Sequence, residues 1–178
     1  VIAAFAIGTG ALRGGLILVI LAAVPDMLDG ALAKASGTSS QRGAFFDSVV
    51  DRITDSVLFG GVAWYFASEK DPHLALLPMA IMGVSSLISY ERAKAESLGL
   101  YAKGGLMERA ERIVVLCLGL LFDSLLVPIM WVMLVLTVIT AVQRFVQVWR
   151  QAEVSPTTQK KRDVRQGRRM TRHSARTS

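Results

Sequence analysis

The stretch PDMLDGALAKASGTSSQRGAFFDSVVDR, residues 25–52, places acidic side chains between two strongly apolar segments. It contains the carboxylates of Asp26, Asp29, Asp47 and Asp51. A charged side chain at bilayer depth costs about 2.5–3.5 kcal/mol on insertion scales, so four of them cost about 10 kcal/mol or more. We therefore expect these carboxylates to bind something that offsets their cost.

The overall composition indicates a membrane protein. Of the 178 residues, 52% are hydrophobic, and the mean hydropathy is +0.45, which is too apolar for an ordinary soluble domain. The chain begins at Val1 inside an apolar run, and we expect it to be a fragment that lacks part of a first span. The single cysteine, Cys117, excludes an internal disulfide.

Positive charge is concentrated at the C-terminal end. The net charge is +6, and ten of the twenty Lys and Arg residues lie from Arg144 onward. We predict that residues 1–150 form a transmembrane domain and that residues 151–178 form a basic, disordered cytoplasmic tail. Because such tails commonly mark the cytoplasmic side of a membrane protein, we expect no nucleic-acid partner.

Hydropathy predicts an all-α integral membrane protein with six transmembrane helices, the first of them truncated, because a span needs about 20 mostly apolar residues. The predicted helices cover 1–11, 14–24, 45–67, 74–96, 113–122 and 125–149, and a polar lead-in places Arg109 and Arg112 at the start of the fifth. If the tail is cytoplasmic, only Arg13 and Lys70 among the basic residues fall outside, as the positive-inside rule requires. The aspartates then face the cytoplasm, and we expect a multi-pass protein of the cell membrane.

The spacing of the aspartates predicts that their side chains converge. Asp26 and Asp29 are three residues apart, and Asp47 and Asp51 are four apart, so each pair shares one face of a helix. The two segments form an antiparallel pair joined by the loop KASGTSSQRG, residues 34–43. Hard oxygen ligands in this number suit Mg²⁺ or Mn²⁺, either one ion or two bridged by shared carboxylates.

Two other interpretations of these carboxylates were weighed against a metal site. In the first, the aspartates cap helix ends or pair with Arg42 and Arg52. In the second, the protein is a metal-ion channel or transporter, which predicts acids near the middle of several spans. The acids instead gather at the inner ends of two spans, which favours an enzyme. Asp55 continues the four-residue spacing, and we expect a structural role for it, beside Arg52 or facing the cavity.

The order of these residues resembles a family signature. Asp26-Met-Leu-Asp29-Gly30-Ala-Leu-Ala33-Lys34 is followed, after eight residues, by Gly43, Asp47 and Asp51. This is similar to the pattern D-x2-D-G-x2-A-R-x8-G-x3-D-x3-D of the CDP-alcohol phosphatidyltransferases. Every spacing matches, and the one departure is Lys34, where the family has arginine and its bidentate contacts.

The resemblance implies a fold and an activity. Family members have six transmembrane helices around a cytoplasm-facing polar cavity and work as homodimers, and they transfer the phosphatidyl group of a CDP-linked lipid to a hydroxyl, releasing CMP. It implies that two Mg²⁺ or Mn²⁺ ions bind Asp26, Asp29, Asp47 and Asp51. It also implies that Asp51 is the general base. The residues implied for CDP-diacylglycerol binding are Asp29, Gly30, Ala33, Lys34 and Gly43.

A second polar cluster bears on the acceptor substrate. It lies in SYERAKAESLGLYAKGGLMERAERI, residues 89–113, and contains Arg92, Lys94, Arg109 and Arg112. Basic side chains beside a metal site suit a phosphorylated acceptor, although ordinary positive-inside charge would also account for them. From charge alone, inositol phosphate and glycerol 3-phosphate are equal candidates.

The same stretch resembles one branch of the family, the actinobacterial phosphatidylinositol phosphate synthases. The similar segments are Ser89-Tyr-Glu-Arg-Ala-Lys-Ala-Glu96, Gly104-Gly105 and Glu108-Arg-Ala-Glu-Arg-Ile113, together with the last span, which contains Gln143-Arg144. The resemblance implies that Arg92, Lys94, Arg109 and Arg112 bind the phosphate of inositol phosphate. It makes phosphatidyl transfer to that acceptor the expected function.

Overall fold

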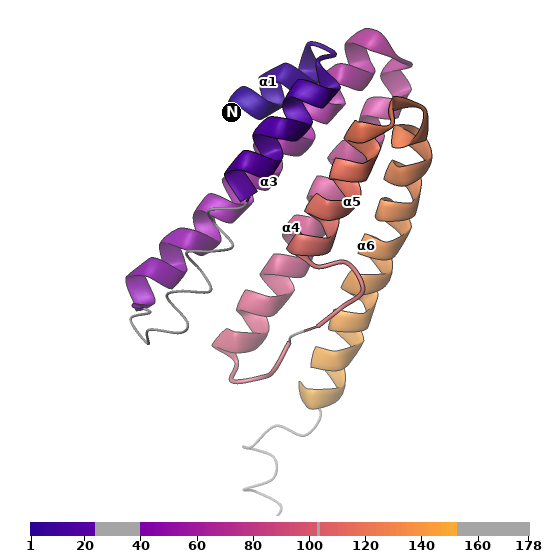
Figure 1. Ribbon diagram of the computed structural model, residues 1–178. Helices are drawn as coiled ribbons and strands as arrows, with labels where there is room; N and C mark the ends of the chain where they lie inside the picture. Colours follow the sequence, from indigo (N-terminus) through magenta and orange to yellow (C-terminus); the bar gives the residue numbers. More distant parts are fainter. Residues whose placement is uncertain (24–39, 103, 153–178) are drawn as a thin grey trace, which may run out of the picture.

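The computed structural model describes residues 1–23, 40–102 and 104–152, and the regular elements in these ranges are all helical. They are α1 (Ile2–Gly8), an apolar helix Leu12–Ala23, α3 (Gln41–Glu69), the short 3₁₀ helix η1 (Pro72–Ala75), α4 (Leu76–Ser97), α5 (Arg109–Leu121) and α6 (Asp123–Ala152). The order of the helices agrees with the sequence prediction. Figure 1 shows α3, α4, α5 and α6 arranged as an elongated bundle.

Helix α3 begins earlier than the sequence predicted. Ser40 is extended, and its hydroxyl accepts a hydrogen bond at 3.0 Å from the backbone N–H of Gly43. This cap satisfies one of the N–H groups that have no partner within the first helical turn. The prediction that the loop continues to residue 43 was therefore wrong, and α3 extends over 29 residues, about 44 Å.

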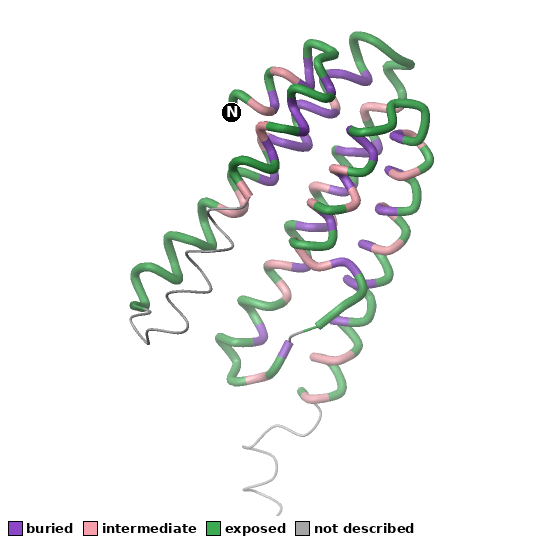
Figure 2. Tube along the Cα trace, viewed as in Figure 1, coloured by how far each residue is buried: buried purple, intermediate pink, exposed green. Residues whose placement is uncertain are grey.

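The helices pack pairwise around one apolar core. α1 contacts α3, α4 contacts both α3 and α6, and α5 contacts α6. Side chains with no exposed surface come from all these helices, among them Ile7, Phe66, Ile81, Leu116 and Met130. Figure 2 shows that buried residues concentrate in the half of the bundle that holds the α5–α6 junction. By contrast, residues 41–50 of α3 are exposed within the described part of the chain.

Within the described ranges, two helical segments are long and apolar enough to cross a membrane, Pro72–Ser97 and Asp123–Ala152. α5 has 13 residues and reaches about 20 Å, which is shorter than the hydrocarbon core of about 30 Å. The start of α5 at Arg109 agrees with the prediction, whereas the predicted start of the last helix was late, because α6 begins at Asp123. A carboxylate is favourable at a helix N-terminus, and Asp123 also accepts hydrogen bonds from Tyr65 and Lys70.

Candidate active site

A cavity of about 440 Å³ lies where α3, α4, α5 and α6 meet. The described part of its lining is rich in charged and hydroxyl side chains and contains no large apolar residue except Ile88. The lining residues are Ala44, Asp47, Ser48, Asp51, Arg52, Ile88, Ser89, Arg92, Ala93, Glu96, Glu108, Arg109, Arg112 and Arg144. Residues more than 90 positions apart in the sequence therefore meet in a single polar site.

The cavity brings together five of the residues that the sequence marked as functional, Asp47, Asp51, Arg92, Arg109 and Arg112. They come from α3, α4 and α5, so the predicted carboxylate and basic clusters form one site. The remaining predicted residues are placed differently. Asp26, Asp29, Gly30, Ala33 and Lys34 lie outside the described residues.

Lys94 and Gly43 are absent from the cavity lining. Lys94 is exposed and follows Arg92 by two positions on α4, a spacing that puts the two side chains on different faces of a helix. Gly43 lies in the first turn of α3, where its N–H is bound by Ser40. The prediction that Arg92 and Lys94 belong to one cluster overlooked that residues two positions apart point to different faces of a helix.

The two described aspartates of the signature supply oxygen donors on adjacent turns of α3. Asp47 and Asp51 both line the cavity, and Mg²⁺ is commonly held by one or two carboxylates together with substrate phosphates. Among the described residues, no group of three or more His, Cys, Asp or Glu side chains is close enough to hold an ion. The carboxylates of Asp47 and Asp51 fit a divalent cation that takes its other ligands from groups outside this pair.

Arg109 connects the carboxylates of α3 to α5. Its Nη1 lies 2.7 Å from Oδ1 of Asp51, and its Nε lies 3.2 Å from Oδ1 of Asp55. The side chain of Arg52 is farther away, with Nη2 3.9 Å from Oδ2 of Asp51. The contact with Arg109 is an ion pair at close range, and Coulomb attraction weakens with distance. Arg109 is thus the main partner of Asp51 among the described residues.

Asp55 has partners that the sequence did not predict. Its side chain is buried, and its second oxygen, Oδ2, accepts a hydrogen bond at 3.1 Å from Nη2 of Arg112. Arg112 is 3% exposed and donates from Nη1 to the carbonyl of Met107 at 3.2 Å. Asp55 was expected beside Arg52 or facing the cavity, but it forms ion pairs with Arg109 and Arg112, which the start of α5 brings to the same carboxylate.

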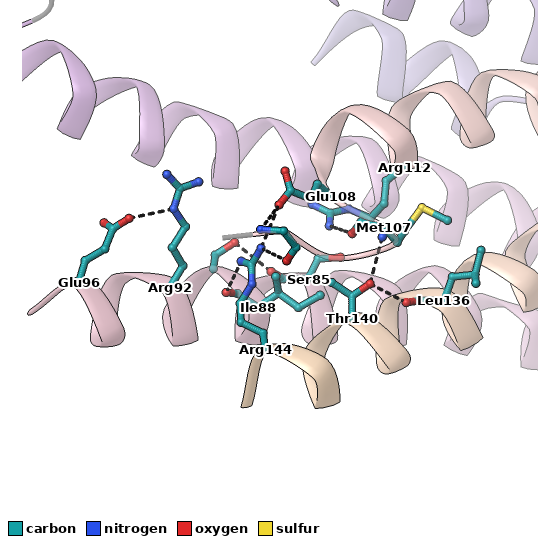
Figure 3. A network of polar contacts seen from close by, with 12 residues as sticks. Ser85, Ile88, Arg92, Glu96, Met107, Glu108, Arg112, Leu136, Thr140 and Arg144 are labelled. Carbon is teal, nitrogen blue, oxygen red and sulfur yellow. Dashed lines mark hydrogen bonds and ion pairs between the residues drawn. The ribbon is translucent and has the colours of Figure 1, made fainter. Parts of the chain in front are cut away.

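Arg144 is a member of the site to which the sequence assigned no role. It is 4% exposed, and Figure 3 shows its guanidinium between α4 and the segment that precedes α5. It donates to the carbonyls of Ile88 and Gly104, both at 3.1 Å, and to Oε1 of Glu108 at 3.2 Å. The available signal was a cation that follows a long apolar run of α6, a position typical of a functional or closely paired group.

Arg92 has a looser environment on the α4 side of the same cavity. Its Nε donates to Oε1 of Glu96 at 3.0 Å, one helical turn away, and both side chains are about half exposed. Figure 3 shows this pair on α4, apart from the contacts of Arg144. Exposed pairs of this spacing contribute little to stability, so Arg92 can exchange its partner at small cost.

Curated relatives share much of this sequence. The chain is 38% identical over 143 residues to the phosphatidylinositol phosphate synthase of Mycobacteroides abscessus. The matched stretch covers 76% of this chain and 65% of the relative. It is 37% identical over 144 residues to the enzyme of the same name from Mycolicibacterium smegmatis, and this match covers 76% of this chain and 65% of the relative. The chain thus spans just under two thirds of the length of these relatives.

Solved structures show the same fold. The crystal structure of Mycobacterium tuberculosis phosphatidylinositol phosphate synthase with CDP-DAG bound matches at a TM-score of 0.76 and 35% identity, over 83% of this chain and 79% of the other. The structure of that enzyme with manganese and citrate matches at a TM-score of 0.76 and 34% identity, over 83% of this chain and 75% of the other. The sequence pattern of the CDP-alcohol phosphatidyltransferases itself matches residues 1–143. With the signature aspartates, the shared fold and this match, the chain belongs to the CDP-alcohol phosphatidyltransferase family.

Proposed function

We propose that this protein transfers the phosphatidyl group of CDP-diacylglycerol to myo-inositol phosphate, giving phosphatidylinositol phosphate and CMP. The observation that carries the proposal is that carboxylates of α3 and arginines of α4 and α5 line one cavity. The carboxylates suit a metal-bound diphosphate, and the arginines suit a phosphorylated acceptor. The similarity to a synthase solved with CDP-DAG supports the lipid substrate.

Two Mg²⁺ or Mn²⁺ ions complete the proposed site, held by Asp26, Asp29, Asp47 and Asp51. The manganese found in the similar Mycobacterium tuberculosis structure supports a divalent ion. Such ions neutralise a diphosphate and stabilise the charge that develops on the leaving group. The proposed contacts to the CDP-lipid are Asp29, Gly30, Ala33, Lys34 and Gly43.

Asp51 acts as the general base in this proposal. A hydroxyl of the acceptor attacks the lipid-side phosphorus, and a new P–O bond forms while the bond from that phosphorus to the oxygen leaving with CMP breaks. The hydroxyl proton passes to the Asp51 carboxylate. Arg109 binds Oδ1 of Asp51, which fixes the orientation of the carboxylate and leaves Oδ2 turned to other partners.

The acceptor phosphate binds the arginine side of the cavity. Arg92 and Arg109 have exposed side-chain surface there, so we propose that they contact the phosphate directly. Arg112 is proposed as a third member of this subsite, lying deeper in the wall. Lys94, on another face of α4, is proposed only as an outer contribution to the positive field that attracts the acceptor.

The proposal includes a membrane arrangement. Residues 1–150 form a transmembrane domain of six spans in the cell membrane, residues 151–178 form a basic cytoplasmic tail, the cavity opens to the cytoplasm, and the protein is a homodimer. The two long apolar segments and the membership of a membrane-enzyme family support this arrangement. The excess of basic residues on the proposed cytoplasmic side supports the orientation.

The proposal is tested in liposomes that contain the full-length protein, CDP-diacylglycerol and Mg²⁺. The release of CMP from CDP-diacylglycerol is measured. Inositol phosphate, glycerol 3-phosphate, free inositol and serine are supplied separately. Release with inositol phosphate alone supports the proposal. Release with glycerol 3-phosphate alone would keep the phosphatidyl transfer and replace the acceptor. No release with any acceptor, from folded protein that binds Mn²⁺, would reject the proposed function.

A further inference from the structure

We propose that Asp55, which lies outside the family signature, is a positioning residue that orients Arg109 and Arg112 toward the acceptor phosphate. The inference rests on the proposed function, because it assigns Asp55 a part in the acceptor subsite of that reaction. Asp55 does not line the cavity itself, but it accepts hydrogen bonds from Arg109 and Arg112, which do.

Both oxygens of the Asp55 carboxylate are committed to guanidinium groups. Oδ1 accepts from Nε of Arg109 at 3.2 Å, and Oδ2 accepts from Nη2 of Arg112 at 3.1 Å. The side chain of Asp55 is 8% exposed. A carboxylate with so little water around it requires charged partners, so the three side chains fix one another.

Charge explains why the two arginines need this carboxylate. Arg109 and Arg112 are three residues apart on α5 and lie on one helical face, where two cations repel each other. A single buried carboxylate between them offsets part of that repulsion. It also restricts two long side chains that would otherwise lose rotamer freedom on binding a ligand. The arginines are therefore pre-oriented before the phosphate arrives.

The geometry also connects Asp55 to the proposed base. Asp51 and Asp55 are one turn apart on α3, and Arg109 bonds to both, with Nη1 on Asp51 and Nε on Asp55. Two bonds from one planar guanidinium define its orientation, whereas one bond leaves rotation about the contact. Asp55 thus holds Arg109 in the plane in which it meets both Asp51 and the cavity.

The test compares Asp55→Asn with the parent protein in liposomes. The change weakens hydrogen bonds to charged groups, which are among the stronger ones, so we expect the KM for inositol phosphate to rise at least about tenfold. The KM for CDP-diacylglycerol should change less than about twofold. The effects of Asp55→Asn and Arg109→Gln on the acceptor KM should be far from additive, because both changes disturb the same guanidinium.

Asp123→Asn is the matched control. Asp123 also accepts from two side chains, Tyr65 and Lys70, but it lies beyond the other end of α5, about 20 Å away along the helix axis. We expect the control to leave the acceptor KM unchanged. If Asp55→Asn and Asp123→Asn lower the melting temperature equally and neither changes the acceptor KM, Asp55 is only structural and the inference is rejected.

Direct binding of inositol phosphate, measured by calorimetry on the Mn²⁺-loaded protein, separates this inference from the proposed function. Weaker binding by Asp55→Asn supports the positioning role even if the parent protein releases no CMP. Equal binding, tighter binding, or no binding by the parent protein would overturn it. Tighter binding would identify Asp55 as a competitor of the phosphate for the two arginines.

Discussion

Arg109 and Asp51, 58 residues apart in the sequence, form the shortest ion pair described in this protein, with Nη1 2.7 Å from Oδ1. The pair joins the residue proposed as general base to a residue proposed to bind the acceptor phosphate. It crosses from α3 to α5 at the wall of the cavity. The guanidinium also lies at an oxygen that the proposed divalent cation would use, so in the proposed site the two cations would compete for one carboxylate.

This competition predicts the effect of Arg109→Gln on metal binding. Removing the guanidinium releases Oδ1 of Asp51 from its ion pair, and a carboxylate without a neighbouring cation attracts another cation more strongly, so Mn²⁺ should bind about tenfold tighter. Titration of Mn²⁺ followed by its electron paramagnetic resonance signal measures this affinity. Arg92→Gln is the control, because Arg92 lines the same cavity but pairs with Glu96. Equal affinities of both variants would contradict the competition.

The proposed base predicts a specific failure of Asp51→Asn. Loss of a general base typically lowers the rate by 10²–10⁴-fold, so CMP release should fall at least about 100-fold while CDP-diacylglycerol still binds. Single-turnover release and equilibrium binding of the lipid measure the two effects separately. Loss of lipid binding by correctly folded Asp51→Asn protein would mean that Asp51 is chiefly a metal ligand.

Arg144 is expected to contribute to stability as well as to the cavity wall. Arg144→Met removes the donor for two backbone carbonyls and for Glu108, and a buried polar group left without a partner costs about 1–3 kcal/mol. The melting temperature in detergent should fall by several degrees. Arg150→Met, an exposed change on the same helix, should leave it nearly unchanged. A fall of the same size in both variants would mean that the buried contacts of Arg144 add nothing.

Two neighbouring glycines of α3 provide a matched test of helix packing. A Cβ at Gly61 would lie 2.7 Å from Cα of Ala4 in α1, whereas a Cβ at Gly60 would meet no atom within 4 Å. Gly61→Ala should therefore destabilise the protein by about 1–3 kcal/mol through overpacking. Gly60→Ala should stabilise it by about 0.5–1 kcal/mol, since alanine favours the helix.

Thermal unfolding in one detergent compares the two glycine variants directly. The contrast between neighbouring positions removes most effects of composition and of the detergent. If Gly61→Ala unfolds at the same temperature as Gly60→Ala, the close approach of α1 and α3 is not a feature of the protein in solution.

Much of the fold could be predicted from local patterns. The apolar runs gave the order of the helices, and the basic residues around 92 and 109 were recognised as one group. The helix starts at Gln41 and Asp123 were missed, because charged and polar residues lower hydropathy even where capping and ion pairs let the helix continue.

The sequence by itself determined the helical class, the family and the placement of Asp47 and Asp51 on one helical face, because signature spacing and helical periodicity are local properties of the chain. Only the tertiary structure decided which cations serve which carboxylates. It joined Asp55 to Arg109 and Arg112, brought Arg144 to the cavity and left Lys94 outside it. Such pairings depend on how α3, α4, α5 and α6 meet, and Coulomb attraction and desolvation act through distance in space rather than separation along the chain.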